Sequence, residues 1–386
     1  MTQLKSILSI AALFAFTTAA MAEDAAAPLT FAQQVDAVMA PFNRTDGPGC
    51  SVGVMQDGAM IHAKGYGMAN LELDVAIAPH SVFRMGSVSK QFTGAAVQLL
   101  AEDGLIDLDE DIHTYLPELP DYGHKVTIRA MLGHFSGMGD YDLIAGSYEG
   151  PAVEGGLDLR SVAGGPYRLG NEDYLSNDEF RDVVLRVPLE LTPETEYRYS
   201  NLAYYLLSEL VTAVTGQTLR NYTEEHMFKP LNMTETLFYD DGNEILPNRA
   251  NGYAPKKGGG FKTDMTNIFT VGDGGLHTSI LDMLKWDDNF FNPKIGNEPA
   301  AFVKTMNTPN SDFRSGDSLY ANGQGVGLFA GRPAFSHSGG WLGTSTYYMR
   351  NEEDHFSIAI LCNDVSASPG RYAAEIAKIY YGDDGE

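Results

Sequence analysis

Strand-like segments lie near both ends of this 386-residue chain, and helical patterns fill the part between them. Near the start, residues 51–55 and 60–67 are strand-like and are joined by the turn Gln56-Asp57-Gly58. Four further strand-like runs and a last helix follow near the end, at residues 325–329, 334–337, 344–349, 356–362 and 371–381. Strands drawn from both ends of a chain favour one α/β domain that is interrupted by the middle of the chain. The pattern therefore predicts a discontinuous α/β domain, residues 23–118 and 266–386, with a mostly helical domain with flexible loops at 119–265.

A predicted loop that runs into a helix carries Ser87 and Lys90. Apolar residues recur after it at helical spacing, with polar residues between them, which predicts an amphipathic helix buried along one stripe. The apolar positions are Phe92, Ala95, Ala96, Leu99 and Leu100. Residues three apart share a helix face, so the Lys90 amine can reach the Ser87 hydroxyl. The free N–H groups and positive dipole end of a first helical turn stabilise an alkoxide and disfavour a charged lysine. Ser87 and Lys90 are therefore the candidate nucleophile and base, at a site expected between the two domains.

A second serine motif is present near the start of the chain and is rejected on its context. Gly49-Cys50-Ser51-Val52-Gly53 matches the G-x-S-x-G pattern of a nucleophile elbow. That pattern requires a strand before the serine and a helix after it. Here a Pro/Gly turn precedes Ser51 and a hairpin follows it, so we predict that Ser51 begins a strand.

The first 22 residues have the features of a secretory signal peptide. Lys5 precedes an apolar run from Ile7 to Phe16, and Ala20-Met21-Ala22 is a small-residue cleavage site. The run is too short to span a bilayer, and no later segment is apolar for long enough. We expect cleavage after Ala22, a periplasmic or secreted mature protein and no membrane span in it.

The charge balance restricts the partners. The chain has 51 acidic and 26 basic residues, a formal net charge of −25. Such acidity argues against nucleic acid or an anionic membrane surface as a partner. It does not identify a substrate, and the oligomeric state stays open.

Cys50 and Cys362 each lie in a strand-like run. Export to an oxidising compartment would allow a disulfide between them. Two buried free thiols are equally compatible with the sequence, because strand adjacency cannot be read from it.

Two loop regions carry no readable pattern. Glycine is dense from residue 144 to 170, which is typical of a functional flap or a disordered loop. Residues 240–265 are rich in Gly, Asn, Pro and Lys and indicate a loop or a hairpin.

Two more motifs complete a set. Tyr199-Ser200-Asn201 opens a predicted helix, and His337-Ser338-Gly339 lies in a predicted strand. With Ser87-Val88-Ser89-Lys90, they match S-x-x-K, Y-x-N and the strand motif K-T-G or H-x-G, in this order. The chain thereby resembles the serine β-lactamase and penicillin-binding-protein family, in its class C β-lactamase-like branch, from about Gly49 to Asn363.

The resemblance implies a fold and a mechanism. The fold would be an antiparallel sheet flanked by helices, with an inserted helical domain. Ser87 would attack a carbonyl, and Lys90 would accept its proton directly or through Tyr199, a choice that stays open. Asn201 would hold Lys90 and contact the substrate. The backbone N–H groups of Ser87 and Gly340 would form the oxyanion hole. Ser338 and Gly339 would bind the substrate. No cofactor is implied, and the substrate would be a small molecule or a peptide.

His337 stands where the K-T-G form of the strand motif has a lysine, and this difference bears on the substrate. A histidine carries a charge only in part near neutral pH. By resemblance, histidine at this place is familiar among D-alanyl-D-alanine carboxypeptidases, D-amino-acid amidases or aminopeptidases, and some esterases. We therefore expect a D-amino-acid-containing peptide as substrate, a small ester second and a β-lactam third, with a non-catalytic penicillin-binding module as the alternative.

His134 and His277 each lie in a Gly/Ser turn. Neither belongs to a spaced metal-binding motif, so no metal is expected. Both are predicted to be hydrogen-bonding loop residues near the cleft.

Overall fold

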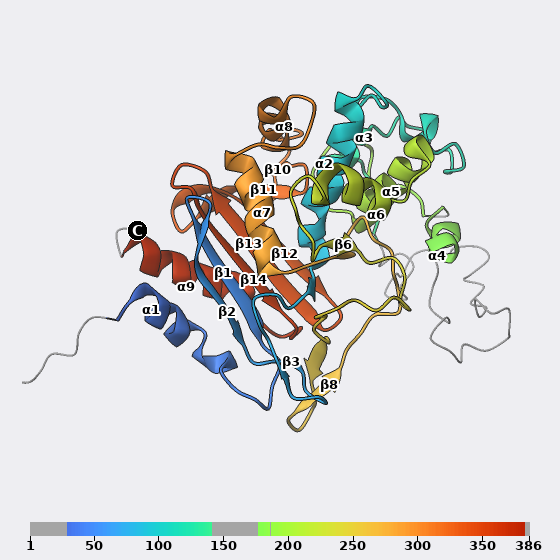
Figure 1. Cartoon of the computed structure of the whole chain (residues 1–386). Coiled ribbons are helices and arrows are strands. Elements are labelled where there is room, and N and C mark those ends of the chain that lie inside the picture. The colour runs from blue at the N-terminus through green and yellow to red at the C-terminus, as the bar shows by residue number, and fades with distance from the viewer. Residues whose placement is uncertain (1–28, 141–176, 186, 383–386) are drawn as a thin grey trace, which may run out of the picture.

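A seven-stranded antiparallel sheet forms the centre of the molecule in the computed structural model, which describes residues 29–140, 177–185 and 187–382 (Figure 1). The strand order is β10-β11-β12-β13-β14-β1-β2. The N-terminal hairpin consists of β1 (Cys50–Gln56) and β2 (Ala59–Tyr66). The other strands are β10 (Leu319–Ala321), β11 (Gln324–Phe329), β12 (Arg332–Trp341), β13 (Thr344–Asn351) and β14 (Phe356–Cys362). The prediction of one α/β sheet built from both chain ends is confirmed, and its strands are antiparallel as the resemblance implied.

The two chain ends meet where β1 pairs with β14. Cys50 lies opposite Cys362 in this pairing, and the two cysteines form a disulfide. The alternative of two free thiols is therefore wrong. Ser51 lies in β1 and is buried, which confirms that its G-x-S-x-G match is a strand and not a nucleophile elbow.

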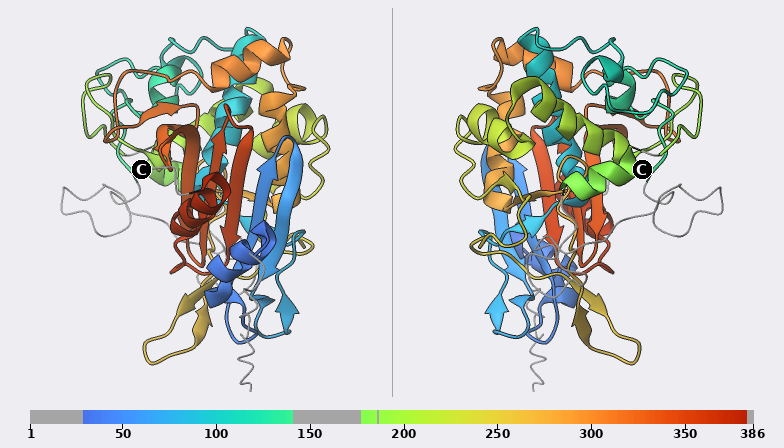
Figure 2. Two further views of the ribbon diagram at one scale, coloured as in Figure 1. Left: turned by 90° about the vertical axis from the view of Figure 1, so that its left-hand side faces the viewer. Right: turned by 90° about the vertical axis from the view of Figure 1, so that its right-hand side faces the viewer.

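Both faces of the sheet are covered, which explains the continuous apolar runs of its central strands. Ile358 and Ile360 of β14 pack under α1 (Phe31–Val38) and α9 (Pro369–Tyr381). The alternate residues Ala359 and Leu361 belong to the core on the other face, with α7 (Ile280–Phe291) (Figure 2). Successive strand residues thus enter two different cores.

A helical layer lies beside the sheet and includes α2 (Lys90–Glu102). Its other members are α3 (Ile128–Leu132), α4 (Asn177–Val184), α5 (Asn201–Thr215), α6 (Leu219–Thr223) and α8 (Pro299–Met306). The boundaries predicted for the two domains stay a prediction, although α2 of the first segment packs against α5 of the inserted one.

The helix after Ser87 differs from the expected one in two ways. Residues Gly86–Ser89 form a 3-10 turn, and the α-helix begins at Lys90. The polar side that we expected to face solvent is also buried, so α2 is a central helix and not an amphipathic one. Its polar side chains find partners inside the protein: Gln98 Nε2 donates to Asn322 Oδ1 at 2.8 Å, and Thr93 Oγ1 donates to the Gly272 carbonyl at 2.7 Å. Such internal pairing makes the burial of polar groups tolerable.

Smaller sheets complete the fold. The strand β9 (Leu276–Thr278) pairs with β5 (Phe83–Arg84) on one side and with β6 (Leu237–Phe238) on the other. Two short antiparallel hairpins are also present: β3 (Met68–Asn70) pairs with β4 (Val75–Ala76), and β7 (Tyr253–Pro255) pairs with β8 (Phe261–Thr263). The pair β7 and β8 confirms a hairpin within residues 240–265.

Two predictions fall outside the described residues: the signal peptide at 1–22 and the glycine-dense stretch at 144–170. A helix with the length and the apolar composition of a membrane span is absent from the described part of the chain.

Candidate active site

The turn that carries Ser87 packs directly against strand β12. Gly86 has φ +51°, and a Cβ atom added to it would lie 2.7 Å from the Gly340 backbone nitrogen. A Cβ atom on Gly339 would lie 2.0 Å from the Met85 carbonyl oxygen. Side chains at either glycine would therefore separate the turn from the strand. The two glycines bring the backbone of Ser87 beside that of Gly340, where the resemblance placed the oxyanion hole.

Lys90 is fully buried and lies at the centre of the candidate site. Its Nζ is 3.2 Å from Ser87 Oγ, 2.7 Å from Asn201 Oδ1 and 2.7 Å from the Asp273 carbonyl oxygen. The amide and carbonyl oxygens have no proton to give, so Lys90 must donate to both of them. Only the contact with Ser87 can run in either direction. A neutral Lys90 would therefore present its lone pair to the Ser87 hydroxyl.

Asp140 fixes the orientation of the Asn201 amide. Asn201 Nδ2 donates to Asp140 Oδ2 at 2.8 Å, which leaves Oδ1 on the side of Lys90. A flipped amide would place an N–H donor against the Lys90 donor. Asp140 is thus a positioning residue that the motifs did not reveal.

Burial lowers the pKa of Lys90 from its usual value to about 8. The charges of Asp273 and Asp140 act in the opposite direction and raise the pKa of Lys90. An amine with a pKa near the operating pH is an effective acceptor for a hydroxyl proton.

Tyr199 stays protonated at neutral pH. Its ring centroid lies 5.0 Å from Lys90 Nζ, and its hydroxyl forms a hydrogen bond with Ser87. Burial raises the pKa of Tyr199 above its usual value, although the Ser87 hydrogen bond acts against this shift. Between the two bases that the sequence left open, these shifts favour Lys90.

Both ring nitrogens of His337 are engaged by the protein. Nδ1 lies 2.6 Å from the Ser338 carbonyl oxygen, to which it must donate, and Nε2 lies 2.9 Å from the Tyr320 hydroxyl. Burial and the nearby Lys90 charge lower the pKa of His337 to about 4. His337 is therefore neutral at pH 7 and accepts the Tyr320 proton at Nε2. His337 therefore provides no positive charge that could lower the pKa of Tyr199.

His134 holds the Tyr199 motif from both sides. Its carbonyl oxygen accepts from the Arg198 N–H at 2.7 Å, and its Nδ1 accepts from the Ser200 N–H at 3.2 Å. Its ring packs on Tyr199 with centroids 4.2 Å apart. His134 has φ +59° and is fully buried, and its Nε2 has no hydrogen-bond partner among the described residues. The expected turn residue is thus also a positioning residue for Tyr199.

His277 does not lie in a loop as predicted. It is part of β9, it is buried, and its Nδ1 is 3.1 Å from the Gly275 carbonyl oxygen. The pairing of β9 with both β5 and β6 turned this apparent Gly-rich loop into a strand. Across the described ranges, the structure has no group of three or more His, Cys, Asp or Glu placed to hold a metal ion.

The structure therefore assembles the predicted residues at one place. Ser87, Lys90, Tyr199 and Asn201 are in contact or within one side-chain length, and the His337 ring centroid is 6.2 Å from that of Tyr199. The residues that sequence reasoning missed are Asp140, Asp273, Tyr320 and the positioning role of His134. Asp273 takes part through its backbone, and no side-chain pattern predicts that.

An antiparallel sheet with a helical layer, and a serine beside a buried lysine and a tyrosine, are the features that the resemblance to the serine β-lactamase and penicillin-binding-protein family implied. The family model described as Beta-lactamase matches residues 31–381, and this chain belongs to that family.

Individual relatives agree with this assignment. The chain is 26% identical to a D-aminopeptidase of Gluconobacter oxydans over 333 residues, which cover 86% of this chain and 59% of that protein. A penicillin-binding protein homologue from Pyrococcus abyssi, described as octameric, has a TM-score of 0.72 at 24% identity and covers 91% of this chain and 77% of its own. The D-amino acid amidase from Ochrobactrum anthropi SV3 has a TM-score of 0.69 at 18% identity, covering 92% and 99%. At these identities the structural likeness concerns the fold. The chain spans about 60% of the length of the curated relatives that it matches.

Proposed function

We propose that this chain is a serine hydrolase that cleaves an amide or ester bond through an acyl-Ser87 intermediate. The observation that carries the proposal is the Lys90 geometry. Two obligatory acceptors take the Lys90 N–H groups, and the lone pair of the neutral amine points to Ser87 Oγ. Deprotonation of Ser87 by this amine makes a nucleophile without any further group.

The remaining site residues have defined tasks in this proposal. The protonated Tyr199 donates a hydrogen bond near Ser87, and it can give its proton to the leaving group and take up in turn the proton that Lys90 accepted from Ser87. The backbone N–H groups of Ser87 and Gly340 stabilise the oxyanion. The pairing of β12 with β11 ends at Ser336, so the backbone beyond it, at Ser338 and Gly339, can bind an extended substrate along the strand.

The charges around Ser87 favour a substrate with a free amine, and the relatives' names suggest a D-amino-acid substrate of the aminopeptidase or amidase type. His337 is neutral and has no free ring nitrogen, so it offers a substrate carboxylate no cation. Asp140 and Asp273 add negative charge near Lys90. A substrate with a free amine suits this field better than a C-terminal carboxylate or a β-lactam carboxylate does. The D-aminopeptidase of Gluconobacter oxydans and the D-amino acid amidase of Ochrobactrum anthropi bear names that agree with this choice.

Acylation of Ser87 is tested directly by mass spectrometry. The full chain is incubated with a fluorophosphonate or a labelled penicillin, and the adduct is located by peptide mapping. We expect an adduct on Ser87 and none in Ser87→Ala. Ser51→Ala is the matched control, because Ser51 lies in a similar serine motif but is buried in β1. No adduct on Ser87, together with no turnover of ester, D-Ala-D-Ala peptide and cephalosporin substrates, would overturn the proposal of a hydrolase.

The substrate class is tested by hydrolysis rates. D-amino acid p-nitroanilides should be cleaved faster than their L-isomers and faster than N-acetylated D-forms. A small ester and a cephalosporin complete the panel. Faster cleavage of a D-Ala-D-Ala peptide with a free carboxylate would overturn the proposal of an aminopeptidase or amidase type. The proposal of a serine hydrolase would still stand.

Export is also part of the proposal. The Cys50 to Cys362 disulfide supports it, because such bonds persist in oxidising compartments. Protein recovered outside the cytoplasm should begin at Glu23 by N-terminal sequencing. A cytoplasmic protein with an intact Met1 would overturn this part.

A further inference from the structure

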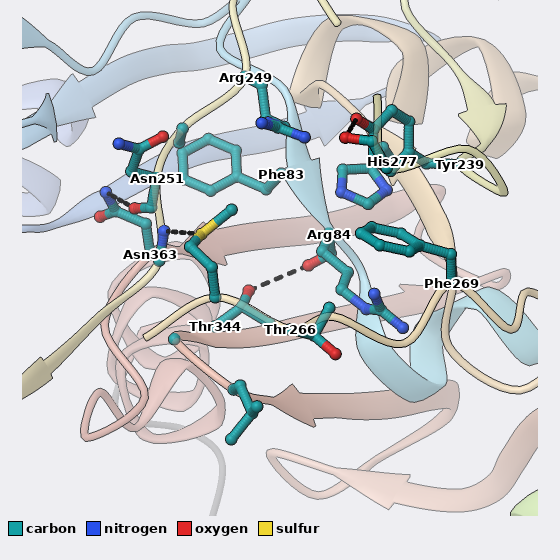
Figure 3. A pocket seen from close by; sticks show the side chains of 16 residues that line it. Phe83, Arg84, Tyr239, Arg249, Asn251, Thr266, Phe269, His277, Thr344 and Asn363 are labelled. Carbon is teal, nitrogen blue, oxygen red and sulfur yellow. Dashed lines mark hydrogen bonds between the residues drawn. The ribbon is translucent and has the colours of Figure 1, made fainter. Parts of the chain in front are cut away.

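A second pocket lies beside the Ser87 turn, at the small sheet of β5, β9 and β6 (Figure 3). Its volume is about 280 Å³, near the lower limit of small-molecule sites, so it suits a ligand smaller than a drug-sized compound. The walls come from Phe83 and Arg84, from the segments 239–252 and 265–269, and from His277 and the turn at 342–344. None of the residues proposed for the acyl transfer lines it.

The lining of this pocket is positively charged, whereas the chain as a whole is negatively charged. Among the described residues, this lining contains Arg84 and Arg249 and no aspartate or glutamate, although acidic residues outnumber basic ones by 51 to 26 in the chain. The acidic residue at its margin, Asp264, accepts a hydrogen bond from the Gly343 N–H at 2.8 Å. A concave surface lined by one sign of charge concentrates ligands of the opposite sign.

Arg249 lies against Tyr239 and has no ion pair among the described residues. Its guanidinium carbon is 5.2 Å from the Tyr239 ring centroid, and it hydrogen-bonds the Tyr239 hydroxyl. The nearby carboxylates of Asp240 and Glu244 are both taken by Arg220, at 3.1 and 2.5 Å. The charge of Arg249 is therefore directed to the pocket without a carboxylate to neutralise it.

Arg84 is fixed by backbone carbonyls. Its Nε and Nη1 lie 3.1 Å from the Gly274 oxygen and 3.4 Å from the Ile268 oxygen. These two contacts hold the Arg84 side chain in the wall of the pocket. Figure 3 shows the Arg84 and Arg249 side chains among the rings of Phe83, Tyr239 and Phe269.

The remaining walls are flat and uncharged. Phe269 packs edge-on against Tyr239, with centroids 5.7 Å apart. His277 donates from Nδ1 to the Gly275 carbonyl, and burial lowers the pKa of His277 to about 3, so its ring is neutral. The pocket thus combines two guanidinium groups with aromatic surfaces, which recognise planar anions by bidentate hydrogen bonds and stacking.

We propose that this pocket is a second binding site, for a small planar organic anion such as an aromatic carboxylate. Its wall is continuous with the Ser87 turn. Thr344 Oγ1 donates to the Arg84 carbonyl at 3.0 Å. Arg84 Nε donates to the Gly274 carbonyl, and the neighbouring Asp273 carbonyl accepts a hydrogen bond from Lys90. A ligand that draws Arg84 toward itself acts on the backbone that holds Lys90.

The test compares three probes of nearly equal shape by calorimetric titration of the full chain: benzoate, neutral benzamide and benzamidinium. Benzoate should bind saturably at one site, and the other two should bind on the order of tenfold more weakly. Benzoate affinity should fall on the order of tenfold in Arg249→Gln and stay unchanged in Arg371→Gln, a control on an exposed arginine of α9 that is paired with Glu375.

Equal binding of benzoate and benzamide, or full affinity in Arg249→Gln, would overturn the proposal. If Arg249→Gln does not fold, the comparison of the three probes on the unaltered chain still decides. None of these outcomes depends on whether Ser87 forms an acyl intermediate.

Discussion

The Tyr320 hydroxyl lies 2.9 Å from His337 Nε2, on the ring edge opposite the bond from Nδ1 to the Ser338 carbonyl. This pair of contacts allows one neutral tautomer and leaves the ring without a free donor or acceptor. The position that carries a permanent cation in K-T-G relatives is here a rigid neutral group. The neutral state of His337 is the basis of the first prediction.

His337→Gln should leave the pH dependence of kcat/KM unchanged between about pH 6 and 9. The pKa of His337 is lowered to about 4, so no proton is gained or lost there in this range. The rate itself should fall several-fold, because the glutamine loses part of the fixed geometry. A shift of the acidic limb by more than about half a pH unit would contradict a neutral His337.

The rate of Ser87 acylation should rise with pH, with a midpoint near 8. The active form of Lys90 is the neutral amine, and burial lowers its pKa to about 8. Below the midpoint the rate should fall about tenfold per pH unit, because only the neutral fraction accepts the Ser87 proton. Stopped-flow labelling by a fluorophosphonate across the pH range measures this directly. A midpoint near 6 would assign the base to a histidine instead.

Asp140→Asn should move that midpoint to lower pH. The Asp140 charge raises the pKa of Lys90, so its removal lowers this pKa further. The asparagine keeps an oxygen that can accept from Asn201 Nδ2, so the amide orientation is retained. Asp109→Asn is the control, because Asp109 is exposed and paired with Arg129. A midpoint that stays near 8 would show that Asp140 acts through geometry alone.

Two substitutions of His134 distinguish the contribution of its hydrogen-bond acceptor from that of its side-chain volume. His134→Asn keeps an acceptor for the Ser200 N–H and tolerates the positive φ, whereas His134→Leu does neither. We expect His134→Leu to lower kcat by about 10²-fold through displacement of Tyr199, and His134→Asn to lower it clearly less. The folded fraction, followed by circular dichroism, identifies a loss that comes from unfolding. Equal losses in the two variants would argue against the positioning role.

Removal of the disulfide should affect stability and not chemistry. Cys50 and Cys362 are 312 residues apart in sequence, so the bond restricts a very long loop in the unfolded chain. Cys50→Ala with Cys362→Ala should lower the free energy of unfolding by about 2–4 kcal/mol in urea titrations. Acylation of Ser87 under native conditions should be retained, because the bond lies at the β1–β14 pair away from Lys90. Loss of labelling in a folded double variant would contradict this.

The order of the motifs predicted which side chains meet. Lys90 and Asn201 begin the helices α2 and α5, and Ser87 and Tyr199 lie just before them, so short-range patterns reveal where these four residues stand in the chain. The strand runs at both ends predicted the sheet for the same reason, since period and residue type are local properties.

What could not be predicted depends on contacts between distant segments. The pairing of Cys50 with Cys362 follows from the neighbour relation of β1 and β14, which no local pattern contains. The burial of the polar residues of α2 follows from the elements that surround it. The neutral state of His337 depends on its burial and on the Lys90 charge, and its tautomer depends on the contact with Tyr320, seventeen residues earlier on β10. The strand character of His277 required partners from two other parts of the chain.

The meeting of β1 and β14 has a consequence for synthesis. Strand β1 can pair at once with β2, which follows it in the sequence, but its pairing with β14 joins Cys50 to Cys362, which are 312 residues apart and so are synthesised far apart in time. Contacts between such distant segments form slowly, and incomplete chains expose unpaired strand edges. Since β12 also supports the Ser87 turn, a nascent or truncated chain that lacks the last strands has the nucleophile but not the surface that orients it.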